Sequence, residues 1–139
     1  MRADVVAVAR RWLGTPYQHQ ASCEGAGSDC LGLVRGIWRE ICGDEPAAVP
    51  AYTPDWSETA KDERLLVEMG RYFDPVAGEA QVGDVLVFRM RAVAKHLAVA
   101  SAQGKIIHAY SGRGVVETPL SAAWEHRIAG VFRFPDRSK

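Results

Sequence analysis

The sequence lacks several features that would point to other classes of protein. It carries no net charge, since 17 lysines and arginines balance 17 aspartates and glutamates. Proteins that bind nucleic acid normally have a basic excess, so we expect no nucleic-acid partner. No apolar run approaches the roughly 20 residues that cross a bilayer, so we expect no membrane insertion. The first residues, MRADVVAVARRWLG, are interrupted by charges and do not resemble a signal peptide, which predicts synthesis in the cytoplasm.

Cysteine is also scarce. The three cysteines are Cys23, Cys30 and Cys42, an odd number without a C-x-x-C spacing. A disulfide framework normally uses an even number, and a zinc site built from these residues would need histidines at untypical separations. The sequence therefore predicts no disulfide scaffold and no metal, and at least one cysteine that keeps its thiol.

The order of the expected elements predicts an α+β fold in one domain, residues 1–139. A chain of 139 residues is too short for two domains with adequate cores. Apolar residues recur at helical spacing in the first half, and the period changes to two from residue 82 onward. This order is typical of helices packed on one face of an antiparallel sheet, here of about five strands. The expected helices are 4–13, 30–42 and 57–73, with a short turn at 121–126, and the expected strands are 85–88, 96–101, 105–110, 115–117 and 129–134.

Cys30 opens the second expected helix, after Ser28 or Asp29 as the capping residue. The positive end of the helix dipole and the N–H groups of the first turn stabilise an anion there, which lowers the pKa of a thiol. Together with an imidazolium they can make the thiolate the dominant form, and the same N–H groups can hold an oxyanion. The alternative is a small buried apolar residue, the commonest fate of a cysteine outside a disulfide.

Two histidines are expected on one face of a hairpin. If a three-residue loop at 102–104 joins the strands, paired residue numbers add up to 206, and His96 becomes a diagonal neighbour of His108. One imidazole could then accept the thiol proton of Cys30 while the other orients it. A two-residue turn, Gln103-Gly104, would give 207 and place His96 on the opposite face. The histidines could instead be metal ligands, although no third ligand lies nearby in the sequence, or half-buried residues without chemistry.

Five segments carry motifs whose order and spacing are specific when taken together. The clearest is DCLGLV at 29–34, in which Cys30 stands at the expected helix start. The others are WLGTPY at 12–17, QVGDVLVF at 81–88, HLAV at 96–99 and IHA at 107–109. Together they resemble the NlpC-type cell-wall peptidases, which are papain-like cysteine hydrolases. That family has an Asp-Cys-Ser-Gly-Leu/Phe-Val motif, an active-site tyrosine and a Gly-Asp-Leu-Val-Phe strand.

The resemblance implies a role for each matching residue. Cys30 would be the nucleophile, His96 the general base and then acid, and His108 the residue that orients His96. Tyr17 would complete an oxyanion hole with the backbone N–H of Cys30, or else form an aromatic lid on the core. Asp29 would recognise the substrate through a free amine of the peptide stem, or else be a simple N-cap. The resemblance implies no metal and no organic cofactor.

The sequence departs from the family pattern in three places. Leu31 replaces the usual serine after the nucleophile, and Gln20-Ala21 replaces a common Gly-Gly pair. Lys95 stands where a serine commonly precedes the histidine. These departures leave the three catalytic positions unchanged, but the pocket that selects the stem peptide could differ from that of other members.

The resemblance implies hydrolysis of an amide bond in the peptidoglycan stem peptide, with the γ-D-glutamyl–diaminopimelate bond as the expected one. Leu31 and the loop QHQAS at 18–22 are similar to the branch found in phage and gene-transfer-agent tails. That branch implies tail-tip or hub proteins as partners and delivery to the envelope of a target cell from outside. Two alternatives stay open: an amidase or acyltransferase that uses the same cysteine and histidine, and a structural tail component without activity.

Overall fold

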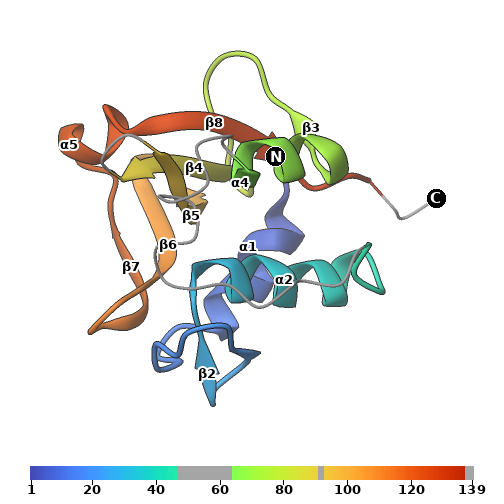
Figure 1. The fold of residues 1–139 in the computed structure, drawn as a ribbon, viewed down its shortest axis with the longest axis vertical. Helices are drawn as coiled ribbons and strands as arrows, with labels where there is room; N and C mark the ends of the chain where they lie inside the picture. Colours follow the sequence, from blue (N-terminus) through green and yellow to red (C-terminus); the bar gives the residue numbers. More distant parts are fainter. Residues whose placement is uncertain (47–63, 91–92, 137–139) are drawn as a thin grey trace.

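A computed structural model describes residues 1–46, 64–90 and 93–136 of the chain (Figure 1). Its helices are α1 (Ala3–Arg11), α2 (Cys30–Ile41), α4 (Arg64–Tyr72) and α5 (Ala122–Glu125). Its strands are β1 (Ser22–Cys23), β2 (Gly27–Ser28), β3 (Asp74–Pro75), β4 (Val85–Met90), β5 (Val93–Ala102), β6 (Lys105–Tyr110), β7 (Gly114–Pro119) and β8 (Ile128–Arg133). Residues 57–63 of the predicted third helix lie outside the described residues.

The strands from β3 onward form one antiparallel sheet in the order β3-β8-β4-β5-β6-β7, six strands among the described residues. Helices α1, α2 and α4 share one apolar core with this sheet, and α1 and α2 lie side by side in Figure 1. The predicted α+β architecture is therefore confirmed. Sequence patterns missed β3, because two residues that include a proline at the sheet edge carry no period-two pattern.

Helix α2 begins at Cys30 because Asp29 caps it. The Oδ1 atom of Asp29 accepts a hydrogen bond from the backbone N–H of Gly32 at 2.7 Å, so Asp29 rather than Ser28 is the cap. Gly43, with φ of +94°, follows the last turn and ends the helix. An apolar stripe at helical spacing holds the helix on the sheet; it consists of Leu33, Val34, Ile37 and Trp38. The cap and the stripe together set where Cys30 lies relative to the strands.

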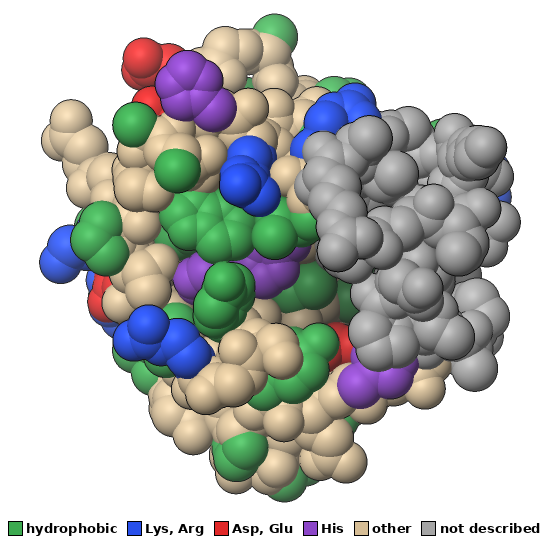
Figure 2. Space-filling view, turned by 60° about the vertical axis from the view of Figure 1, so that its left-hand side comes forward, with side chains coloured by type: hydrophobic (Ala, Val, Ile, Leu, Met, Phe, Trp, Pro, Cys, Tyr) green, Lys and Arg blue, Asp and Glu red, His purple; other side chains and the backbone are tan. Residues whose placement is uncertain are grey.

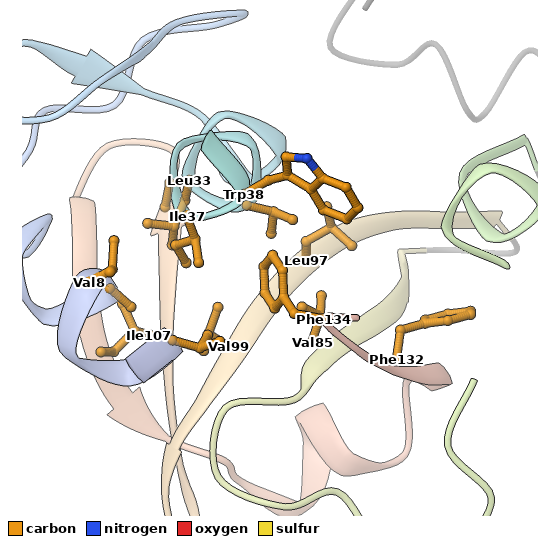
Figure 3. Packing of buried hydrophobic residues seen from close by; sticks show 14 of the residues in the cluster. Val8, Leu33, Ile37, Trp38, Val85, Leu97, Val99, Ile107, Phe132 and Phe134 are labelled. Atoms are coloured by element: carbon orange, nitrogen blue, oxygen red, sulfur yellow. The ribbon is translucent and has the colours of Figure 1, made fainter. Parts of the chain in front are cut away.

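The sheet is buried on both faces where β4, β5 and β6 run side by side. On one face Leu97, Val99 and Ile107 belong to the main core, together with residues of α1 and α2 (Figure 3). On the other face a second cluster includes Trp124 of α5. The buried members of this cluster are Leu86, Phe88, Ala98 and Ile106. Burial on both faces explains why β4 reads as the continuous apolar run VLVF instead of an alternation.

The loop between β5 and β6 is shorter than predicted. Ala102 pairs with Lys105, which leaves a two-residue turn, Gln103-Gly104, whose glycine lies in the left-handed region at φ of +73°. The predicted three-residue loop is therefore wrong. The pairing of β5 resumes at Ala100, so a bulge takes up one residue of this strand.

The bulge restores the register that brings the two histidines together. At Val99, which pairs with Ile107, the paired residue numbers add up to 206, the value predicted for the longer loop. His96 and His108 therefore share one face of the sheet as diagonal neighbours, and this prediction is confirmed. Without the bulge, a two-residue turn would place His96 on the other face.

Gly36 on α2 tests the contact between the two N-terminal helices. A Cβ atom at this position would lie 2.1 Å from the ring of Trp12, which is buried, so the ring or the helix would have to shift. We predict that Gly36→Ala lowers the free energy of unfolding by about 1–3 kcal/mol in urea denaturation. The control is Gly70→Ala on α4, where nothing lies within 4 Å and alanine should raise it by roughly 0.5–1 kcal/mol. Equal effects at the two positions would contradict this packing.

Candidate active site

Cys30 lies where the N-terminus of α2 meets β5. Its side chain is half-buried and packs against the main core, and its thiol faces the backbone N–H of Leu97, the residue after His96. The ladder between β5 and β6 that the structure describes runs from Ala102 to Val99. Leu97 lies beyond this ladder, and its backbone N–H faces the thiol of Cys30 at the start of α2. Cys30 therefore lies beside β5, the strand that carries His96.

Burial determines the charge of the Cys30 thiol. Burial, followed by the charge of the neighbouring Asp29, raises the pKa of this thiol to about 12. The backbone N–H groups of Leu97, Leu31 and Cys30 itself lower the pKa, in the direction expected at a helix start, but burial outweighs them. The thiol is therefore protonated at neutral pH, and the helix start alone does not make it a thiolate.

His96 and His108 form the central polar contact of the site. Nε2 of His96 lies 2.8 Å from Nδ1 of His108, and Nε2 of His108 lies 3.1 Å from Oγ1 of Thr118 on β7. Burial lowers the pKa of His96 to about 3 and that of His108 to about 4. The lesser causes are the charge of His108 acting on His96 and that of Arg113 acting on His108. Both imidazoles are therefore neutral at pH 7.

A neutral imidazole has one N–H donor and one acceptor nitrogen. The proton position on one ring therefore decides whether each contact from His96 through His108 to Thr118 is donated or accepted. If Nε2 of His96 donates to His108, then Nδ1 of His96 is the acceptor and can take a proton from a thiol. His108 then uses its own Nε2 to donate to Thr118. Sequence reasoning missed Thr118, although the diagonal rule that joins the two histidines also joins His108 to Thr118.

Aromatic rings enclose the imidazole pair. The ring centroid of His96 lies 6.0 Å from that of Phe88 and 5.4 Å from that of Trp124. The ring centroid of His108 lies 5.6 Å from those of Trp124 and Tyr110. On the face drawn in Figure 2, histidine side chains lie between hydrophobic ones. These rings displace water from around the imidazoles, and this burial is the physical reason for their lowered pKa values. Trp124 was also missed, because a tryptophan in a short turn matches no motif.

Tyr17 lies in the loop before α2. Its backbone forms a parallel bridge with Ser28, and its ring packs against the main core. Burial raises the pKa of its hydroxyl, and the charges of Cys30 and Asp29 raise it further, so the hydroxyl lies near both groups. The structure thus brings Tyr17 to the start of α2, and its place in an oxyanion hole stays a prediction.

The carboxylate of Asp29 is buried and holds two backbone segments together. Its Oδ1 accepts the N–H of Gly32 at 2.7 Å, and its Oδ2 accepts the N–H of Gln20 at 2.8 Å. Nδ1 of His19 lies 3.9 Å from Oδ2. Asp29 is therefore an N-cap that also ties the loop at 18–22 to the helix start. Its role in substrate recognition stays a prediction.

Residues 14–133, which include all of these side chains, match the model of the family described as NlpC/P60. This chain belongs to the NlpC/P60 family. A comparison with curated protein sequences finds no match.

Solved structures of NlpC/P60 proteins share this papain-like α+β fold. An NlpC/P60 family protein from Bacillus cereus has a TM-score of 0.68 at 22% identity, with 96% of this chain and 40% of that chain covered. The NlpC/P60 domain of the peptidoglycan hydrolase SagA has a TM-score of 0.65 at 23% identity, with 96% and 99% covered. The peptidoglycan hydrolase RipB from Mycobacterium tuberculosis has a TM-score of 0.61 at 19% identity, with 95% and 65% covered. This chain therefore spans less than half of the Bacillus cereus protein and nearly all of the SagA domain.

Two of the three departures from the NlpC/P60 pattern fall on side chains that the structure describes. Gln20 lies in the left-handed region with φ of +65°, a conformation that glycine adopts without steric cost. Leu31 is half-buried and packs against the main core. The side chain of Lys95 lies outside the described part of the chain. Both described departures lie beside the helix start, where they can change the shape of the site without replacing its polar groups.

Within 1–46, 64–90 and 93–136, no three His, Cys, Asp or Glu side chains gather as a metal site. In the same ranges no helix has the length and apolar character to cross a membrane. All three cysteines are thiols; Cys23 is exposed, and Cys30 and Cys42 are half-buried.

The lowered pKa values of the two histidines predict how stability depends on pH. An unfolded histidine titrates near 6.5, whereas folded His96 and His108 titrate near 3 and 4, so the unfolded chain binds more protons between these values. The contribution of the two neutral histidines to the free energy of unfolding is complete above about pH 6.5. It is lost as the pH falls, at up to about 1.4 kcal/mol per pH unit for each histidine. Urea denaturation between pH 7 and pH 5 measures it.

A matched pair of variants isolates this contribution. His108→Asn removes one of the buried imidazoles and should flatten the fall of the free energy of unfolding below pH 6.5. His126→Asn alters an exposed position and should keep the slope of the unaltered protein. Parallel slopes in all three proteins would mean that the buried histidines are not held neutral.

Proposed function

We propose that this protein is a cysteine peptidase that hydrolyses an amide bond in the stem peptide of peptidoglycan. The proposal is carried by the His96–His108 hydrogen bond in an NlpC/P60 domain whose helix-start thiol, Cys30, faces the backbone N–H of Leu97, the residue after His96. Two structures of the same fold are those of peptidoglycan hydrolases, SagA and RipB, which supports the substrate class. Cys30 would be the nucleophile, His96 the base and then the acid, and His108 the orienting residue.

The first half-reaction forms a thioester. The proton of the Cys30 thiol passes to Nδ1 of His96 as Sγ attacks the amide carbon. Burial disfavours a lone thiolate or a lone imidazolium, so the two charges form together, and their attraction offsets the cost of burying them. The imidazolium then protonates the leaving amine, the C–N bond breaks, and the acyl group stays on Sγ.

The second half-reaction returns the thiol. His96 takes a proton from water, whose oxygen attacks the thioester carbon, and the departing thiolate recovers that proton. In both halves the carbonyl oxygen becomes an oxyanion. The backbone N–H of Cys30 and the hydroxyl of Tyr17 are the proposed donors, and one well-placed donor contributes about 3 kcal/mol to such a transition state.

We further propose that the cleaved bond is γ-D-glutamyl–diaminopimelate and that the enzyme belongs to a phage or gene-transfer-agent tail. The resemblance of Leu31 and of the loop at 18–22 to the tail-associated branch supports this finer proposal. Such an enzyme would be assembled in the cytoplasm with tail-tip or hub proteins and would act in the envelope of a target cell. The proposed reaction uses no metal, organic cofactor or nucleic acid.

Cys30→Ala should abolish hydrolysis and leave the fold intact. Loss of the nucleophile of a catalytic triad lowers kcat by about 10⁶-fold elsewhere, so we expect turnover of purified stem peptide to fall by at least about 10⁴-fold. Chromatography of the digest with mass detection measures it. Cys23→Ala and Cys42→Ala are the matched controls, since both are thiols outside the proposed site, and should keep full activity. Retained turnover in Cys30→Ala would contradict the mechanism.

The product masses from the same digest separate the competing functions. Addition of water to the acyl fragment indicates a hydrolase. Transfer of the acyl group to an added amine indicates an acyltransferase that uses the same cysteine and histidine. Intact stem peptide after incubation with the unaltered protein would instead favour a structural tail component.

Asp29→Asn tests whether this carboxylate recognises a free amine. Asparagine keeps one side-chain oxygen, which can accept the N–H of Gly32, so α2 should keep its start. The negative charge is lost, together with the hydrogen bond that Oδ2 accepts from the N–H of Gln20. For a stem peptide with a free N-terminal amine, we expect KM to rise about tenfold or more with little change in kcat. For the same peptide with the amine acetylated, KM should rise far less, because only the lost contact between Asp29 and the loop at 18–22 acts there. An equal rise of KM for both peptides in steady-state kinetics would mean that Asp29 only caps α2 and supports the loop at 18–22.

A further inference from the structure

We propose that Thr118 is a positioning residue for the His96–His108 pair. Its hydroxyl oxygen accepts a hydrogen bond from Nε2 of His108 and thereby stabilises the form in which Nε2 of each imidazole carries the proton. This inference rests on the proposed hydrolysis by Cys30. It adds to that reaction a residue outside the five motifs that first pointed to the site.

Thr118 reaches His108 by the same diagonal step that joins the two histidines. His108 pairs with Val116 and Ile106 pairs with Thr118, so His108 and Thr118 are diagonal neighbours on one face of β6 and β7. Nε2 of His108 lies 3.1 Å from Oγ1 of Thr118. Three side chains on consecutive strands, β5, β6 and β7, therefore form one line of contacts.

The backbone around Thr118 is held in place on both sides. The carboxylate of Glu117 accepts hydrogen bonds from Oγ of Ser101 at 2.6 Å and from Arg10 of α1 at 2.8 Å. The backbone N–H of Leu120 donates to the carbonyl of the β5–β6 turn at 2.8 Å. Because successive residues of a strand point to opposite faces, Glu117 fixes β7 without competing for the hydroxyl of Thr118.

The direction of these hydrogen bonds matters for the reaction. His96 can take a proton at Nδ1 only when its own proton is on Nε2, which then donates to Nδ1 of His108. The proton of His108 is then on Nε2 and needs an acceptor, which the hydroxyl of Thr118 supplies. In the opposite arrangement Nδ1 of His96 would carry the proton and could not accept that of a thiol.

Water is poorly placed to substitute for this hydroxyl. His108 is 2% exposed, and Trp124 lies against both imidazoles, with ring centroids 5.4 Å from His96 and 5.6 Å from His108. A buried N–H without an acceptor is unfavourable, so loss of the hydroxyl should move the proton of His108 to Nδ1. That tautomer reverses the direction of the whole line of hydrogen bonds.

The test compares Thr118→Val with Thr118→Ser. Valine keeps the branched shape of threonine without the hydroxyl, and serine keeps the hydroxyl. The ¹⁵N chemical shifts of the His108 ring nitrogens identify its tautomer. We expect the Nε2–H form in the unaltered protein and in the serine variant. In the valine variant we expect a shift toward Nδ1–H, with kcat for stem peptide about tenfold lower and KM little changed.

Three outcomes would overturn the assignment. The first is an unchanged tautomer together with an unchanged kcat in Thr118→Val, and the second is an Nδ1–H form of His108 in the unaltered protein. The third is a lower kcat with an unchanged tautomer in a valine variant whose melting temperature is unchanged. That outcome would mean that Thr118 acts through packing alone. If the unaltered protein does not cleave stem peptide, the proposed hydrolysis fails, and the NMR comparison still decides the role of Thr118.

Discussion

The hydrogen bond between Nε2 of His96 and Nδ1 of His108, 2.8 Å long, is the contact on which the site depends. It joins two strands diagonally, so it exists only in the register that the bulge in β5 produces. It also occupies Nε2 of His96 and leaves Nδ1 as the nitrogen that would take part in the proposed proton transfer. The cap at Asp29 positions the other part of the site, because it makes Cys30 the first residue of a helix that packs on β5.

Burial shapes the chemistry of this site as much as its stability. The helix start favours an anion at Cys30, yet removal of the thiol from water has the larger effect, and the same burial keeps both imidazoles neutral. A protonated thiol is a weak nucleophile and a poor target for oxidants. Reactivity would therefore arise when the thiol proton moves to His96 during attack, so that charge appears as an ion pair and only while a substrate carbonyl is being attacked.

Local signals in the sequence predict part of this arrangement, and tertiary contacts decide the rest. The Asp29–Cys30 helix start and the main strands follow from capping chemistry and period-two alternation, whereas the shared face of the histidines depends on the bulge in β5. The turn at Gln103-Gly104 was predicted one residue too long, because its residues suit either length and the bulge is decided by packing on both faces of the sheet. Thr118 could not be found without the β6–β7 register, and the protonation of the thiol depends on burial, which no local pattern reveals.

The most direct test of the central claim, that Cys30 attacks the substrate with His96 as its base, is detection of the covalent intermediate. The protein is mixed with purified stem peptide, quenched in acid within the first turnovers and fragmented in a mass spectrometer to locate any added acyl group. We predict an acyl mass on Cys30 that disappears as product forms. Cleavage of the peptide with no acyl group on Cys30, or with the acyl group on Cys23 or Cys42, would contradict it.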